Sequence, residues 1–108
     1  MKKYKTILSA QNAQEIIMLI GHLYNKHSEE FSVSEAIAFA VLVETVLAIK
    51  KKTVEYRREY SFSFTATQAI ALSYMYRAFI EGSGNENQFT NRMMQINNEV
   101  LQHYSISF

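Results

Sequence analysis

Residues 31–40 read FSVSEAIAFA and residues 64–73 read FTATQAIALS, so one pattern occurs twice, 33 residues apart. In each copy a hydroxyl-bearing residue, Ser32 or Thr65, stands three positions before a Glu or Gln. At this spacing the hydroxyl caps the helix and the Glu or Gln side chain bonds back to the capping residue. Both copies are therefore predicted to begin a helix.

Two explanations of the repeat stay open: two helix starts that meet the same capping demands, or internal duplication of a helical unit. The repeat aligns Glu44 with Arg77, and each charge interrupts an otherwise apolar segment. A buried charge without a partner is costly. We therefore expect Glu44 and Arg77 either to pair, within or between chains, or to point to solvent at the rim of their helices.

Apolar periodicity predicts four helices. The first, capped by Ser9, and the last, from about Asn87 to Tyr104, each carry a single apolar stripe. The second, from about Val33 to Arg57, and the third, from about Ala66 to Glu81 with Gly82 as its C-cap, are apolar around much of their circumference. The pattern predicts an all-α fold, with residues 1–108 forming one bundle of about four helices and the second and third helices central.

Residues 54–65 support an alternative, because apolar and polar residues alternate there with the period of a strand. Residues 2–8 and 104–108 also alternate and are the available partners, which would give an α+β fold with a small sheet. A helical stripe that continues through Thr53, Tyr56 and Tyr60 favours a long second helix that gives way to extended chain near Ser61.

The second and third helices carry more apolar surface than two flanking helices can cover. Soluble monomers seldom expose large contiguous apolar patches, and two-fold association is the commonest way to bury them. We therefore expect a homodimer through these two helices. The predicted interface residues are Phe39, Val43, Val46, Leu47, Ile70 and Tyr74.

Composition argues against catalysis. The chain has 108 residues, three histidines, no cysteine and a formal net charge of +1, and it contains no aspartate and no phosphate-binding glycine loop. Disulfides, thiolate chemistry and cysteine-ligated metals are thereby excluded, and no pair of histidines has the spacing of a metal site on a helix. We expect a non-enzymatic protein with no cofactor and no metal site.

The sequence also bears on location. The N-terminal residues carry lysines but no apolar core of a signal peptide. The most apolar stretch, residues 36–49, is too short to span a membrane and contains Glu44. We expect a cytoplasmic protein without a membrane-spanning segment.

These observations predict a helical protein-interaction module with a regulatory, inhibitory or accessory role. The alternative is a small nucleic-acid-binding regulator that uses residues 50–58, where cations alternate with Tyr56 and, just beyond, Tyr60. The same cations also suit the solvated C-terminal end of a helix, whose dipole they complement. The candidate binding residues are Lys50, Lys51, Lys52, Arg57 and Arg58.

Overall fold

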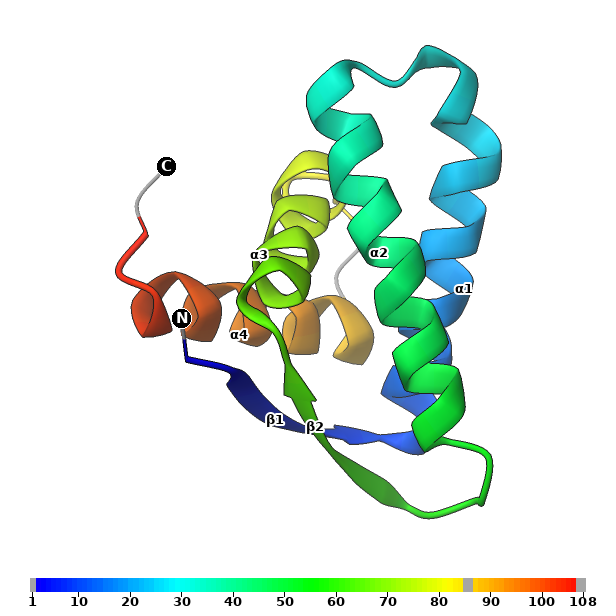
Figure 1. The fold of residues 1–108 in the computed structure, drawn as a ribbon, viewed down its shortest axis with the longest axis vertical. Helices are drawn as coiled ribbons and strands as arrows, with labels where there is room; N and C mark the ends of the chain where they lie inside the picture. Colours follow the sequence, from blue (N-terminus) through cyan, green and yellow to red (C-terminus); the bar gives the residue numbers. More distant parts are fainter. Residues whose placement is uncertain (1, 85–86, 107–108) are drawn as a thin grey trace.

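The computed structural model in Figure 1 describes residues 2–84 and 87–106. Four α-helices lie in these ranges together with one two-stranded sheet, a 3-10 turn and a π-helical turn, which confirms the predicted helical bundle. In chain order the elements are β1 (Tyr4–Ser9), α1 (Ala10–His27), η1 (Ser28–Glu30), α2 (Val33–Lys52), β2 (Glu59–Phe64), α3 (Ala66–Met75), η2 (Tyr76–Ile80) and α4 (Gln88–His103).

The predicted helix starts are confirmed. The Ser32 hydroxyl accepts a hydrogen bond from the Glu35 amide at 3.2 Å, and the Glu35 carboxylate accepts one from the Ser32 amide at 3.1 Å. Thr65 makes the same reciprocal pair at the start of α3, and Ser9 caps α1. Because these bonds satisfy amides that the first turn leaves without a partner, they fix where each helix begins.

The long second helix is a wrong prediction, since α2 ends at Lys52 rather than near Arg57. Residues 59–64 form β2, which pairs antiparallel with β1 from Tyr4 opposite Phe64 to Ser9 opposite Glu59. The strand alternative is therefore confirmed for these two segments. It fails at residues 104–106, which follow α4 as a turn and irregular chain; residues 107–108 lie outside the described part.

The physical reason for the strand is the burial that its alternation allows. Tyr60, Phe62 and Phe64 point into the core and are at most 5% exposed, while the residues between them face solvent. The Tyr60 hydroxyl also ties the preceding turn together, because it donates to the Glu55 carbonyl at 2.7 Å and accepts from the Arg57 amide at 2.8 Å. A continued helix would forgo both the burial and these bonds.

The sheet and all four helices contribute to one apolar core. Helix α3 packs against α2 on one side and α4 on another, and α1 packs on α2 to form a hairpin (Figure 1). The buried Ser73 hydroxyl donates to the Asn97 side-chain oxygen and joins α3 to α4. The Arg92 guanidinium donates to the Thr6 hydroxyl and the Ile7 carbonyl, which joins α4 to β1. Helix α3 is thus central, as predicted.

Helix α2 is covered on one side only, which differs from the predicted central position. Its buried residues, Phe39, Leu42, Thr45 and Ile49, recur every three or four positions and form one stripe towards the core. The opposite side of α2 lies at the surface of the molecule, as Figure 1 shows.

Candidate functional site

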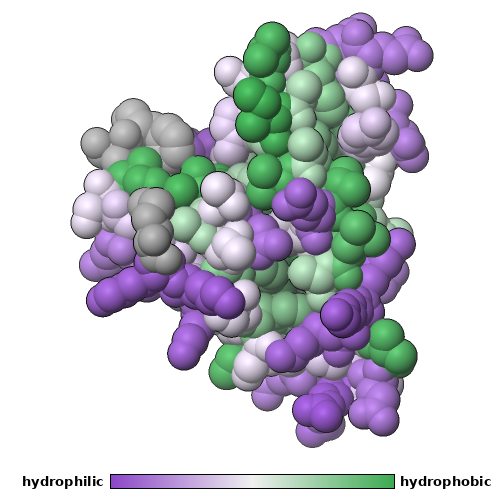
Figure 2. Space-filling model, in the orientation of Figure 1, coloured by the Kyte–Doolittle hydropathy of each residue, from purple (hydrophilic) through white to green (hydrophobic). Residues whose placement is uncertain are grey.

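The exposed side of α2 is apolar. Ile37 and Leu47 are 63% and 62% exposed, and Val33 reaches 78%. In the space-filling view, hydrophobic residues gather along α2 and are interrupted by a few hydrophilic ones (Figure 2). The outer face of α2 consists of six exposed apolar residues: Val33, Ala36, Ile37, Ala40, Val43 and Leu47.

Helix geometry explains why these residues share one side. At 3.6 residues per turn, Val33, Ile37, Ala40 and Leu47 fall close to one line along the helix, opposite the stripe centred on Leu42. Apolar side chains in such a row present an apolar surface, here interrupted by Glu44. Apolar surfaces mark interaction sites in soluble proteins. The outer face of α2 is therefore the candidate site.

The repeat offers an internal comparison for this face. Ala40 in α2 corresponds to Ser73 in α3, and Val43 corresponds to Tyr76 in η2. Ala40 is exposed and Val43 is 43% exposed, whereas Ser73 and Tyr76 are 1% and 9% exposed. The difference arises because α4 packs on this side of α3 and η2. The side of α3 that α4 covers therefore corresponds to the side of α2 that is exposed to solvent.

The predicted dimer residues do not form one surface. Phe39 is 1% exposed and stacks on Phe31 at 4.6 Å between ring centroids, so it is a core residue and cannot contact a partner on this surface. Val46, Ile70 and Tyr74 are partly buried. Val43 and Leu47 are exposed and lie on the outer face of α2.

Sequence reasoning missed Val33 and Ile37, although a signal for them was present. They repeat with Ala40 and Leu47 at helical spacing, and a second stripe runs through Phe39 and Leu42. Two apolar stripes on opposite sides of a helix predict that both sides are covered, either within the chain or by a partner.

The structure does not show the predicted ion pair among the salt bridges of residues 2–84 and 87–106. Glu44 and Arg77 are both exposed, and Arg57 forms a salt bridge with Glu55 at 4.0 Å. Solvent exposure removes the cost of burial that would otherwise require the pairing. Glu44 lies within the outer face of α2, so pairing of Glu44 with Arg77 between two chains stays a prediction.

The candidate nucleic-acid segment lies at the end of the molecule that carries the sheet. Its five cations are exposed, and Lys2, Lys3 and Lys5 of the N-terminal segment are exposed as well. Tyr56 is 82% exposed and free to stack, but Tyr60 is buried and holds the turn, so it is not a stacking platform. The segment thus supplies cations and one aromatic ring rather than two.

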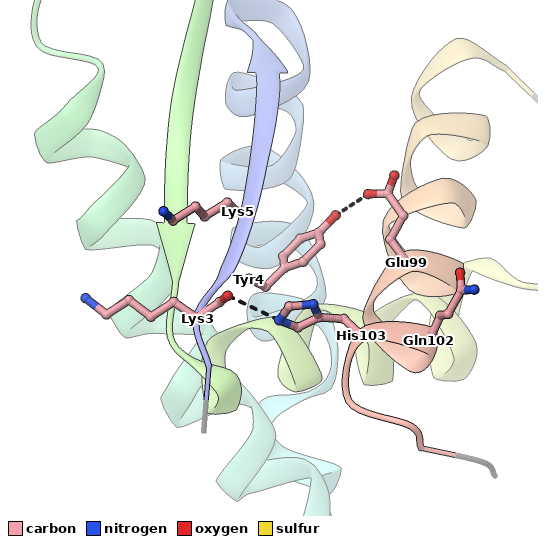
Figure 3. Close-up of a pocket in the computed structure, with 6 residues that line it drawn as sticks. All are labelled: Lys3, Tyr4, Lys5, Glu99, Gln102 and His103. Atoms are coloured by element: carbon pink, nitrogen blue, oxygen red, sulfur yellow. Dashed lines mark hydrogen bonds between the residues drawn. The ribbon is translucent and has the colours of Figure 1, made fainter.

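A shallow pocket lies between β1 and α4 (Figure 3). Its lining includes Tyr4, whose hydroxyl donates to a Glu99 carboxylate oxygen at 2.5 Å, and His103, whose imidazole bonds the Lys3 carbonyl at 3.2 Å. Burial, and then the hydrogen bond to Glu99, raise the pKa of Tyr4 to about 12. A tyrosine held protonated in this way serves to anchor β1 on α4 rather than to exchange protons near neutral pH.

Metal centres and membrane-spanning helices are both absent from residues 2–84 and 87–106. No group of three or more His, Asp or Glu side chains there is placed to hold a metal ion. None of the helices in the described ranges combines the length and apolar composition needed to cross a membrane. In comparisons with known proteins, no family model, no curated protein and no solved structure gives a significant match.

Proposed function

We propose that the protein is a non-enzymatic cytoplasmic interaction module, regulatory, inhibitory or accessory in role, that binds a protein partner through the outer face of α2. The observation that carries this proposal is the exposure of Val33, Ile37 and Leu47 in a single row. Burying apolar surface contributes about 25 cal/mol per Å², so a partner that covers this row gains binding free energy without any rearrangement of the core.

A non-enzymatic role is supported because the polar side chains of the pocket already make hydrogen bonds that hold the fold together. Tyr4, Glu99 and His103, which line the pocket of Figure 3, hold β1 against α4. Arg92 likewise anchors Thr6 and the backbone of Ile7. These groups are engaged in the fold, whereas the residues of the outer face of α2 are exposed in the described part of the chain.

Site-specific photo-crosslinking in cells that produce the protein tests the proposal. A photoreactive amino acid replaces Ile37, and in a matched control it replaces Met18 of α1, which is also 63% exposed. We expect a discrete protein adduct from position 37 and none from position 18, and we expect Leu47→Arg to abolish it. Equal adducts at both positions, or none at position 37, would contradict the proposal.

The mass of the adduct also identifies the class of partner. An adduct of twice the 12.5 kDa chain mass contains a second copy. Any other discrete mass indicates a different protein, which is then purified and tested for direct binding to the wild type and to the Leu47→Arg variant.

A second candidate function is nucleic-acid binding, and the grouping of exposed cations at the sheet end supports it. Phosphate contacts release counterions, so the affinity would fall steeply with salt. A gel-shift series with a single-stranded oligonucleotide compares wild type with K51E/R58E and with a control, K26E, on α1. Binding that weakens with salt and is lost only in K51E/R58E would support this function; binding insensitive to both would exclude it.

A further inference from the structure

We propose that a second copy of this chain covers the outer face of α2, with the two α2 helices packed antiparallel about a two-fold axis near Ala40. The inference rests on the proposed function of this face as a binding surface and names its occupant. It narrows the predicted homodimer to α2 alone, since α3 is already covered by α2 and α4.

The outer face of α2 has a shape that fits a helix. At the equivalent positions of the repeat, α4 covers α3 and η2, and the Ser73 side chain that corresponds to Ala40 is buried there. Alanine at the middle of an exposed helix side permits an even closer approach of a second helix. A second copy of the chain always supplies another α2, whose own outer face is exposed in the same way.

The charges at the two ends of α2 are opposite in sign. Acidic residues gather at the N-terminal end of α2, where Glu29 and Glu30 precede it, while Lys50, Lys51 and Lys52 end it. A matching helical partner must be basic beside the acidic end and acidic beside the basic end. A second α2 that runs antiparallel has this pattern, and its helix dipole also opposes the first. A parallel arrangement would place like charges together.

The sequence of α2 also allows a symmetric register between two antiparallel copies. If the axis passes near Ala40, residues equally distant from position 40 face each other. Val33 and Leu47 are each seven positions away, and Ile37 and Val43 are each three away, so apolar side chains meet apolar side chains. The turn η1 (Ser28–Glu30), which precedes α2, then lies at the same end of the dimer as Lys50–Lys52 of the second copy. Every contact occurs twice, as two-fold symmetry requires.

Sedimentation equilibrium of the full chain tests the dimer, over about 1 to 500 µM because a helix pair is a small interface and its affinity is expected to be modest. We expect a reversible equilibrium between the 12.5 kDa chain and a species of twice that mass. Leu47→Arg should raise the dissociation constant by about tenfold or more, since it places a charge in the apolar row. The control Met18→Arg should leave the dissociation constant unchanged.

Charge exchange tests the antiparallel arrangement. In K50E/K51E, and separately in E29K/E30K, like charges meet at both ends of the dimer, so each variant alone should dissociate at concentrations where wild type is dimeric. In a parallel dimer the same variants would leave like charges facing like charges, as in wild type, and should not weaken association. Mixing the two variants restores opposite charges in either orientation, so a heterodimer at about 0.05 M salt, where screening is weak, shows that each variant lost only its charge match. Circular dichroism melts confirm that each variant is folded.

The outcomes are distinct. A chain that stays monomeric throughout, or a dimer that Leu47→Arg does not weaken, overturns the second copy as occupant. A dimer that Leu47→Arg weakens, but that K50E/K51E and E29K/E30K leave as strong as wild type, overturns the antiparallel arrangement. If the chain is monomeric and position 37 still crosslinks a different protein, the inference fails while the proposed function stands.

Discussion

Helices α2 and α3 begin in the same way and end in different surroundings. Both start with a capping box and the sequence Ala-Ile-Ala. In α3 the residues at positions 69, 71, 72, 73 and 75 are all buried, whereas α2 buries only one stripe. The difference lies in what packs on each helix: α4 covers the side of α3 whose counterpart in α2 is exposed. The two helices are thus apolar around similar widths, but the described part of the chain covers only one side of α2.

The largest effect that tests this comparison comes from truncating one leucine in each helix. Leu72 in α3 is 0% exposed and Leu47 in α2 is 62% exposed. Leu72→Ala leaves a cavity and should lower the free energy of unfolding by about 2 to 5 kcal/mol. Leu47→Ala, measured at a concentration where the chain is monomeric, should change it by less than about 0.5 kcal/mol.

Urea denaturation followed by circular dichroism gives both values. Equal losses in the two variants would show that the outer face of α2 is covered within one chain. A loss in Leu47→Ala that grows with protein concentration would instead report self-association, because binding adds to the apparent stability of the folded state.

The helix starts were predictable because a capping box is local. Ser32 and Glu35, or Thr65 and Gln68, carry the whole signal within four residues. Residues 53–64 were harder, since Tyr56 and Tyr60 fit both a helical and an alternating period. The pairing of Tyr4 with Phe64 joins segments 60 residues apart, and no local pattern specifies it.

The candidate site was predictable only in part, for a related reason. Periodicity shows that Leu47 and Phe39 are both apolar and lie on different sides of α2, but burial depends on which elements pack there. Phe39 contacts Phe31 and Phe79 from other segments, and Leu47 faces solvent. The sequence thus predicts an excess of apolar surface on this helix, but it does not determine which side is buried in the core and which side stays exposed.

A smaller effect is expected from exchanging the residues at the corresponding positions 73 and 40. Ser73→Ala removes the buried hydrogen bond to Asn97 and leaves the Asn97 side-chain oxygen without that donor. We expect a loss of about 1 to 3 kcal/mol in the free energy of unfolding. The reciprocal change, Ala40→Ser, places a hydroxyl in solvent and should be close to neutral in the monomer.

Thermal or chemical denaturation measures the free energy of unfolding of the two variants. It thereby compares the covered side of α3 with the exposed side of α2. If Ser73→Ala were as mild as Ala40→Ser, the contact between α3 and α4 would contribute little. The comparison between a covered and an uncovered helix side would then lose its energetic basis.

The caps should give similar and smaller losses in both helices. Ser32→Ala and Thr65→Ala each remove one side-chain acceptor from the first turn, and each should cost about 0.5 to 2 kcal/mol. Ser34, the exposed second residue of α2, is the control. Ser34→Ala should leave the free energy of unfolding nearly unchanged. Denaturation midpoints unchanged by both cap substitutions would show that the two helices do not depend on these starts, and the likeness between them would be one of sequence only.

The smallest expected effect concerns Glu44, the charge within the outer face of α2. In the proposed register Glu44 lies opposite Ala36 of the second copy, which offers no cation, so dimer formation partly desolvates the carboxylate at a cost. Glu44→Gln removes that charge and should tighten the dimer by a few fold, which corresponds to about 0.5 to 1 kcal/mol. Sedimentation equilibrium at neutral pH measures the change, and Glu15→Gln on α1 serves as the control for net charge. Weakening by Glu44→Gln would instead support the ion pair between Glu44 and Arg77 of two chains that the repeat predicts, and it would move the two-fold axis away from Ala40.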